Sequence, residues 1–219
     1  EADEESNATL APRSFLLLDS GAHYVSGTTD ITRTIPLGPL TDEERKTYTL
    51  VLKGHIALAR ARFPERTQGL VLDFAARYAM WQEGMDFGHG TGHGVGCHLC
   101  VHEGPQQIRK NTNAASTTPF VAGMTITDEP GIYISGKFGV RLENVLLTRE
   151  YAQTNFGRFL EFETLTLCPF DTTPIIVDML DENERNWLNR YHESVREQLL
   201  PLLSDEKDCA WLERATLPL

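Results

Sequence analysis

Four carboxylates stand inside apolar, strand-like sequence, and they constrain the fold of this chain more than any other feature. Asp19 follows Phe-Leu-Leu-Leu and Asp30 precedes Ile-Thr-Arg-Thr-Ile. Glu129 closes Met-Thr-Ile-Thr-Asp, and Glu143 lies between Val-Arg-Leu and Asn-Val-Leu-Leu. Burying a carboxylate costs free energy of desolvation unless a cation compensates its charge. Each carboxylate alone could end a strand or pair with an arginine, so the set has to be weighed together.

Histidine is concentrated in a glycine-rich stretch that begins at Gly88. Four of the seven histidines lie there, at His89, His93, His98 and His102. A single histidine would more often only donate a hydrogen bond to a backbone carbonyl. Four among glycines that bury no apolar surface favour a metal site or an acid–base site. With the four carboxylates they fit a site for two metal ions, whose oxygen-rich ligands suit manganese, cobalt or zinc.

Two other interpretations of this stretch fail on spacing. The alternating glycines could cradle a phosphate, but Val95 stands where a dinucleotide-binding loop needs its third glycine, and no Lys-Ser/Thr pair follows. Cys97 and Cys100 form a lone C-x-x-C without a second pair. They would also face opposite sides of an extended segment, so we interpret them as two small thiols.

Composition excludes several classes of function. Twenty Lys and Arg against thirty-one Asp and Glu give a formal net charge of -11, which argues against nucleic-acid and membrane partners. The apolar runs are far shorter than the roughly 20 residues that cross a bilayer. Four irregularly spaced cysteines do not make the disulfide framework of a small secreted protein, so we expect a reducing compartment.

The pattern of apolar, glycine and capping residues predicts strands, then two helices, then strands and helices again. Strands are expected at residues 15–18, 24–25, 31–35, 121–127, 131–134 and 140–147. Helices are expected from a capping box at Thr41 to Pro64, and at 70–82, 181–199 and 204–214. This order indicates an α+β fold in one domain and not regular βαβ alternation.

Six motifs follow one another along the chain. They are Asp19-Ser-Gly-Ala-His-Tyr, Asp30-Ile-Thr-Arg-Thr, His89-Gly-Thr-Gly-His93-Gly-Val-Gly, Val101-His102-Glu-Gly-Pro, Thr127-Asp-Glu129-Pro-Gly and Arg141-Leu-Glu143-Asn. Together they resemble the dinuclear metallopeptidases of family M24, which have the creatinase/aminopeptidase or "pita-bread" fold. The residues of these motifs are most similar to those of the Xaa-Pro aminopeptidases of the eukaryotic cytosolic type, and the resemblance extends from about Phe15 to the C-terminus.

This resemblance implies a curved mixed β-sheet with helices on its outer face, and it implies metal ligands. Asp19 would chelate one metal ion, Asp30 and Glu143 would bridge two, and His93 with Glu129 would complete the second. The ions would be Mn²⁺ by preference, with Co²⁺ or Zn²⁺ as alternatives. A hydroxide that bridges them would hydrolyse the N-terminal Xaa-Pro peptide bond.

The resemblance also assigns residues that act beside the ligands. The catalytic residues would be His89, His102 and Glu129. His102 would contact the substrate or the tetrahedral intermediate, and Glu129 would carry a proton from water to the leaving proline nitrogen. Tyr133 and Arg141 would support the ligand geometry, as would His89.

One departure bears on the extent of the protein. The family has another active-site histidine before the first aspartate, at a position that would precede Glu1 of this chain. The large eukaryotic members of the family also have further N-terminal domains. We therefore expect residues 1–219 to be a single catalytic domain, a C-terminal fragment that binds metal yet cleaves Xaa-Pro peptides poorly. The expected partners are peptides with proline at the second position, the missing N-terminal domains and, in a homodimer, a second copy. The expected location is cytoplasmic.

Other activities remain open within the same fold. Methionine aminopeptidase shares the five-ligand plan and is nearer in length, and prolidase and creatinase are further alternatives. The sequences Asp-Ile-Thr-Arg-Thr and Asp-Glu-Pro-Gly favour the prolyl enzymes. A non-catalytic binding module for peptides or histones is the alternative of another class, and the five intact ligand types disfavour it.

Overall fold

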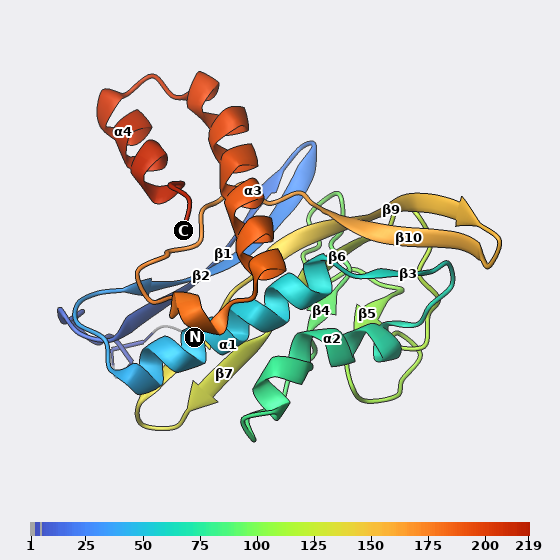
Figure 1. The fold of residues 1–219 in the computed structure, drawn as a ribbon, viewed down its shortest axis with the longest axis horizontal. Helices are drawn as coiled ribbons and strands as arrows, with labels where there is room; N and C mark the ends of the chain where they lie inside the picture. Colours follow the sequence, from blue (N-terminus) through green and yellow to red (C-terminus); the bar gives the residue numbers. More distant parts are fainter. Residues whose placement is uncertain (1–2, 5) are drawn as a thin grey trace.

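The structure, a computed structural model, describes residues 3–4 and 6–219, so residues 1, 2 and 5 of the expected domain lie outside it. The described residues form four α-helices and ten β-strands (Figure 1), which confirms the α+β class. All strand pairs of the described residues are antiparallel, whereas a mixed sheet was expected. The reason is that hairpins join the main pairs, and a tight turn can only join antiparallel strands.

A long ribbon at the beginning of the chain carries two of the carboxylates. It pairs β1 (Phe15–Tyr24) with β2 (Gly27–Pro36). Asp19 lies near the middle of β1, opposite Thr32 of β2. The separate strand expected at residues 24–25 was wrong, because these residues end β1 and enter the turn of the ribbon.

Helix α1 (Asp42–Ala59) follows and begins at the predicted capping box. The Thr41 hydroxyl accepts a hydrogen bond from the Glu44 amide at 3.2 Å, and Glu44 Oε2 accepts one from the Thr41 amide at 2.7 Å. The helix does not continue to Pro64 as expected. Residues 62–64 instead form β3 (Arg62–Pro64), which pairs with a strand almost a hundred positions later.

The remaining helices lie close to their expected positions. They are α2 (Gly69–Trp81), α3 (Glu182–Leu199) and α4 (Glu206–Ala215), with short 3-10 turns at Val177–Met179 and Leu200–Leu202. Asp181 caps α3 in a second capping box, and Asp205 caps α4 through the amides of Lys207 and Asp208. Local capping chemistry therefore sets where these last two helices begin.

The later strands build the sheets that face the ribbon. They are β4 (Gly92–His93), β5 (Gln107–Ile108), β6 (Thr125–Asp128), β7 (Gly131–Ile134), β8 (Phe138–Arg141), β9 (Asn144–Thr154) and β10 (Gly157–Thr164). One sheet has the order β3-β10-β9-β6, and its β9–β10 hairpin extends beyond the body of the molecule (Figure 1). The strand expected at 140–147 is divided in two, the one at 121–127 begins only at Thr125, and β10 was not predicted.

Two apolar clusters hold these layers together, and α1 contributes to both. One cluster joins Tyr48, Leu52 and Ile56 of α1 to β7, β8 and α3. The other joins the end of α1 and the inner face of α2 to β6, β9 and β10. Among the described residues, no helix is both long enough and apolar enough to cross a membrane.

Candidate metal centre

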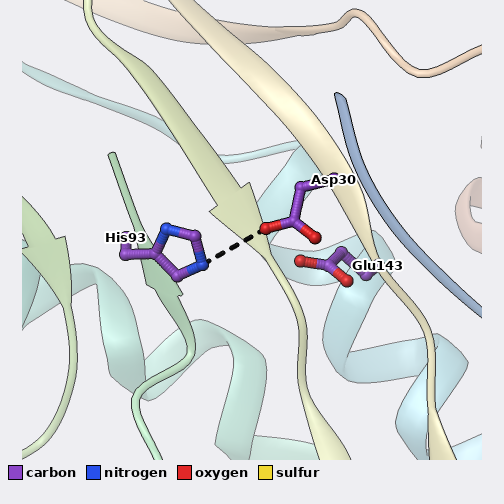
Figure 2. A group of neighbouring side chains, drawn as sticks. All are labelled: Asp30, His93 and Glu143. Atoms are coloured by element: carbon purple, nitrogen blue, oxygen red, sulfur yellow. Dashed lines mark ion pairs between the residues drawn. The ribbon is translucent and has the colours of Figure 1, made fainter. Parts of the chain in front are cut away.

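Three side chains from distant parts of the chain meet where the ribbon faces β4 and the start of β9. Asp30 lies on β2, His93 on β4 and Glu143 just before β9, and one ligand atom of each lies within 4.8 Å of the other two. Figure 2 shows the two carboxylates facing each other with the imidazole directed toward them. Carboxylate and imidazole groups gathered in this way are a donor set for a divalent metal ion.

The orientation of His93 is fixed from its other side. Its Nδ1 donates to the Gly94 carbonyl oxygen at 3.0 Å, which leaves Nε2 free to act as a ligand. Nε2 lies 3.5 Å from Asp30 Oδ2 and 3.4 Å from Glu129 Oε1. Glu129 therefore borders the same centre as the other three.

Two threonine hydroxyls, which the sequence analysis did not single out, hold the carboxylates. Thr32 Oγ1 donates to Glu143 Oε2 at 2.6 Å. Thr127 Oγ1 accepts from the His93 amide at 3.0 Å and donates to Glu129 Oε1 at 3.2 Å. A signal was available, because Thr32 follows Asp30, and Thr127 precedes Glu129, by two positions. That spacing places both members of each pair on one face of an extended segment.

Asp19 lies at the edge of the centre and pairs with an arginine. Its carboxylate, about half exposed, accepts a hydrogen bond from Arg141 Nη2 at 2.5 Å. Arg141 also donates from Nε to Thr32 Oγ1 at 3.1 Å and from Nη1 to the Tyr133 hydroxyl at 3.0 Å. The arginine thus links the ribbon to β7 beside the carboxylates.

Burial and mutual repulsion raise the pKa values of three carboxylates at the centre. Burial and the charge of Glu143 raise the pKa of Glu129 to about 8. Burial, with Asp30 and Asp19 nearby, raises the pKa of Glu143 to about 7. The pKa of Asp30 is raised by burial and by Asp19. Such a cluster would be stabilised by cations at its centre, so the residues present fit divalent metal ions.

The two expected catalytic histidines flank this cluster. His89 Nδ1 donates to the Gly90 carbonyl oxygen at 2.7 Å, and Nε2 accepts from the Tyr133 hydroxyl at 2.9 Å. Burial, with Arg141 and Arg77 nearby, lowers the pKa of His89, which favours this neutral form. The exposed His102 makes a T-shaped ring contact with His93, with ring centroids 4.2 Å apart.

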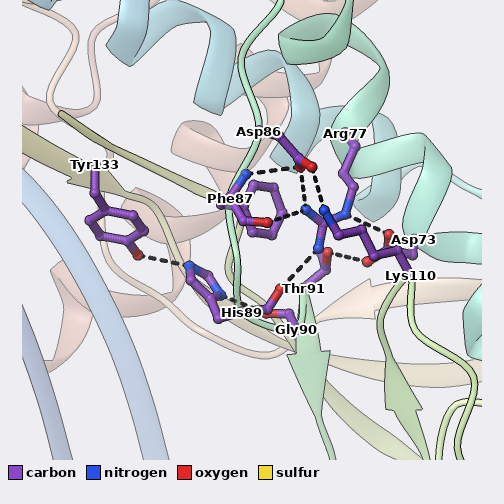
Figure 3. Close-up of polar contacts among 9 residues, drawn as sticks. All are labelled: Asp73, Arg77, Asp86, Phe87, His89, Gly90, Thr91, Lys110 and Tyr133. Carbon is purple, nitrogen blue, oxygen red and sulfur yellow. Dashed lines mark hydrogen bonds and ion pairs between the residues drawn. The ribbon is translucent and has the colours of Figure 1, made fainter.

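A buried arginine on α2 anchors the loop that carries His89 (Figure 3). Arg77 is fully buried and donates to Asp73 Oδ2 and Asp86 Oδ1, both at 2.6 Å. Its Nη2 also donates to the His89 carbonyl oxygen at 2.9 Å. Asp73 in turn accepts from the Thr91 hydroxyl at 2.6 Å. Sequence reasoning missed this network, although Asp73 and Arg77 show the i, i+4 spacing of a helical ion pair.

Two cavities meet at the centre. The larger, about 670 Å³, is lined by His89, Arg109 and Arg141 among others. The smaller, about 300 Å³, is lined by Asp19, Asp30, His23 and Glu143 among others. The side chains that border both cavities are His93, His102 and Glu129. The two cavities are therefore continuous across these three side chains at the centre.

The structure leaves two features of the glycine-rich stretch outside this group. His98 is exposed and does not join the cluster of Asp30, His93 and Glu143. Cys97 and Cys100 are free thiols, and Cys97 is exposed. The argument that the two cysteines face opposite sides of a strand does not apply, because the segment is a loop in which Leu99 has a positive φ of 56°.

Comparison with known families gives two matches that together cover most of the chain. A model of metallopeptidase family M24 matches residues 2–150, and a model of the C-terminal region of the M24 peptidases matches residues 158–219.

Among curated proteins, aminopeptidase P1 of Arabidopsis thaliana is 46% identical over 99% of this chain and 34% of its own length. Xaa-Pro aminopeptidase 1 of Dictyostelium discoideum is 43% identical over 99% of this chain and 35% of its own length. The chain thus spans about a third of the relatives that it matches.

Among solved structures, the X-prolyl aminopeptidase of Caenorhabditis elegans, described as a cytosolic enzyme with a di-nuclear active site, superposes with a TM-score of 0.92. It is 42% identical and covers all of this chain and 36% of its own. The prolidase of Pyrococcus furiosus superposes with a TM-score of 0.57 at 32% identity, over 68% of this chain and 41% of its own. These likenesses confirm the expected pita-bread fold.

Proposed function

Because the chain belongs to metallopeptidase family M24, we propose that it forms the catalytic part of an aminopeptidase that hydrolyses the bond between an N-terminal residue and a following proline. Relatives named Xaa-Pro aminopeptidase align over nearly the whole chain, which supports this substrate class. Residues 1–219 form one catalytic domain in this proposal. The complete protein adds N-terminal domains, works in the cytoplasm and pairs with a second copy.

The observation that carries the proposal is the group of carboxylates around an imidazole, in which Asp30 and Glu143 are buried and Asp19 is about half exposed. Its ligands are Asp19, Asp30, His93, Glu129 and Glu143, all of which line the smaller cavity. They would hold two divalent ions, by preference Mn²⁺, with Co²⁺ and Zn²⁺ as alternatives, because oxygen-rich donor sets suit hard and borderline metals. The chemistry supplied by bound ions is polarisation of the scissile carbonyl and activation of a water near neutral pH.

Glu129 moves the proton in this proposal. Its carboxylate accepts a proton from the attacking water as the new carbon–oxygen bond forms. It then delivers that proton to the proline nitrogen as the carbon–nitrogen bond breaks. The Thr127 hydroxyl, 3.2 Å from Glu129 Oε1, keeps the carboxylate directed at His93 and the site.

The flanking residues bind and orient the substrate. His102 borders both cavities, so its imidazole can donate to the substrate carbonyl as negative charge develops there. His89, Tyr133 and Arg141 form a chain of hydrogen bonds at 2.9 and 3.0 Å that ends at Asp19. This chain fixes the position of Asp19 and gives the larger cavity a polar wall.

Dipeptide cleavage of the prolidase type is the second candidate. The superposition on prolidase structures favours it, but that match leaves about a third of this chain uncovered. Methionine aminopeptidase activity remains the alternative with the same ligand plan, and a non-catalytic module is the alternative that lacks activity.

Metal analysis and peptide cleavage by the full-length protein test the proposal. We expect about two divalent ions per chain and cleavage of Arg-Pro-X peptides in preference to Met-Ala-X peptides and Xaa-Pro dipeptides. Asp30→Asn and Glu143→Gln should each lose metal and activity together. Glu197→Gln, which removes an exposed carboxylate of α3, is the matched control and should keep both. A full-length protein that binds no metal, or prefers another peptide class, would refute the proposal.

A further inference from the structure

One arginine at the metal centre has no acidic partner. Arg109 lies directly after β5 and lines the larger cavity together with His89 and Arg141. Its buried Nε has no hydrogen-bond partner, and Nη1 makes only a 3.3 Å hydrogen bond to the Gln107 side chain. Within the described part of the chain, Arg109 forms no ion pair. The other arginine of the cavity, Arg141, is in contrast neutralised by Asp19 at 2.5 Å.

Strand pairing holds Arg109 next to the proposed ligands. In the β4–β5 pair, Gln107 lies opposite His93 and Ile108 lies opposite Gly92. Arg109 is therefore one residue beyond this pair, beside the segment between His89 and His93. A Cβ built on Gly90 would lie 3.5 Å from the Cβ of Arg109, so the first part of the arginine side chain lies against the backbone at Gly90. A half-buried guanidinium is thus kept close to the site.

The two cavities differ in charge in a way that orients a peptide. The smaller cavity is lined by the proposed metal ligands Asp19, Asp30 and Glu143, so the scissile bond and the amino end of a substrate lie on that side of the site. The larger cavity adds the positive charge of Arg109, since the charge of Arg141 is balanced by Asp19. A peptide whose amino end lies at the metal ligands directs its remaining residues, and its own carboxylates, toward Arg109.

We propose that Arg109 determines specificity by binding a carboxylate of the departing peptide, beyond the proline. The carboxylate comes from an acidic side chain or from the C-terminus of a short peptide. The planar guanidinium of Arg109 suits a carboxylate, because two parallel N–H donors can bind both carboxylate oxygens. Glu103 lines the same cavity but forms no ion pair with Arg109 in the described structure, so the guanidinium is available. This inference rests on the proposed aminopeptidase function.

Peptide series that differ only in charge test the inference on the full-length, metal-loaded protein. The substrates are Ala-Pro-Gln-amide without a carboxylate, Ala-Pro-Glu-amide with a side-chain carboxylate, and Ala-Pro-Gln with a free C-terminus. We expect kcat/KM for at least one carboxylate peptide to exceed that for the neutral peptide about tenfold. The peptide that shows the preference identifies the source of the carboxylate.

Variants assign that preference to Arg109. Arg109→Gln should bring the ratio between carboxylate and neutral peptides close to one, and Arg109→Glu should invert it in favour of Ala-Pro-Lys-amide. Arg60→Gln removes an equal charge from the exposed end of α1 and should keep the wild-type ratio. Calorimetric binding of Pro-Glu-amide and Pro-Gln-amide should show the same loss of discrimination in Arg109→Gln, independently of turnover.

The possible failures are distinct. Wild-type protein that cleaves Xaa-Pro peptides without any preference for a carboxylate overturns the role of Arg109 and leaves the proposed function standing. A preference that survives Arg109→Gln does the same. Wild-type protein that cleaves no Xaa-Pro peptide overturns the proposed function, and this inference with it.

Discussion

Two threonine hydroxyls hold the carboxylates of the candidate metal centre from the side that faces the protein. Thr32 is the more central, because its oxygen donates to Glu143 at 2.6 Å and accepts from Arg141 Nε at 3.1 Å. A hydroxyl in this position occupies one carboxylate oxygen and leaves the other free to face an ion. Groups that orient ligands in this way commonly change metal affinity by 10- to 100-fold when they are removed.

Thr32→Val should therefore weaken binding of Mn²⁺ by about tenfold, because Glu143 loses the hydrogen bond that orients it. Isothermal titration of the metal-free full-length protein measures this affinity. Thr34→Val is the matched control. It lies on the same strand and is also buried, but its hydroxyl bonds to the backbone of Arg141. Equal losses of affinity in both variants would show that Thr32 acts only through general stability.

At the scale of elements, the short strand β4 lies directly against β6. A methyl group on Gly92 would lie 1.8 Å from the carbonyl oxygen of Thr127. No side chain fits there, so glycine is what allows the backbone of β4 to approach that of β6. This contact sets the spacing between His93 on β4 and Glu129 just after β6.

Gly92→Ala should push β4 away from β6 and separate His93 from Glu129, because the new methyl group would overlap a backbone oxygen that cannot move on its own. We expect loss of Mn²⁺ binding and a lower melting temperature, measured by titration and by calorimetry. Gly88→Ala is the control, since a Cβ there meets no atom within 4 Å. Normal metal binding by Gly92→Ala would contradict this account of the contact.

Local signals in the sequence predicted the helices better than the strands. The capping box at Thr41 was confirmed, since its two hydrogen bonds lie within four residues. The end of α1 was misplaced because residues 62–64 pair with β10, which lies far away in sequence. The strand expected at 140–147 is divided because the Glu143 amide donates to Thr32 of the ribbon at 3.1 Å. Pairings of this kind depend on partners that periodicity alone does not identify.

The candidate site, like the fold, could be predicted from the sequence only in part. The ligand types could be picked out because charged groups in apolar strands are conspicuous, and the structure does gather Asp30, His93 and Glu143. Their roles as ligands stay a prediction. Arg109 was not anticipated, because its place beside His93 follows from the pairing of β4 with β5. A two-residue strand gives almost no signal in the sequence.

At the scale of the whole molecule, part of the net charge of -11 is concentrated at one site. Four of the surplus acids, Asp19, Asp30, Glu129 and Glu143, line the smaller cavity. Two divalent cations would bring the net charge to -7, which is an ordinary net charge for a small domain. Bound metal should therefore relieve repulsion inside the native fold, and that relief is lost on unfolding.

Mn²⁺ should accordingly raise the melting temperature of the metal-free protein. At a free concentration 100 times Kd, binding to the native state alone stabilises it by about 2.7 kcal/mol. Differential scanning calorimetry with increasing Mn²⁺ checks this, and sodium chloride at matched ionic strength controls for screening. Asp30→Asn should abolish most of the shift. A shift of equal size with sodium chloride would mean that screening, and not binding, stabilises the protein.

The hydrogen bond between Thr32 and Glu143 joins residues that are 111 positions apart in the chain. Contacts of such long range close large loops, which makes them slow to form during folding. The residues around the centre come from the ribbon, from β4, from the end of β6 and from the start of β9. No single hairpin or helix contains the site, so it is complete only after these segments have assembled. A growing polypeptide would consequently remain without a complete metal centre until its fold closes.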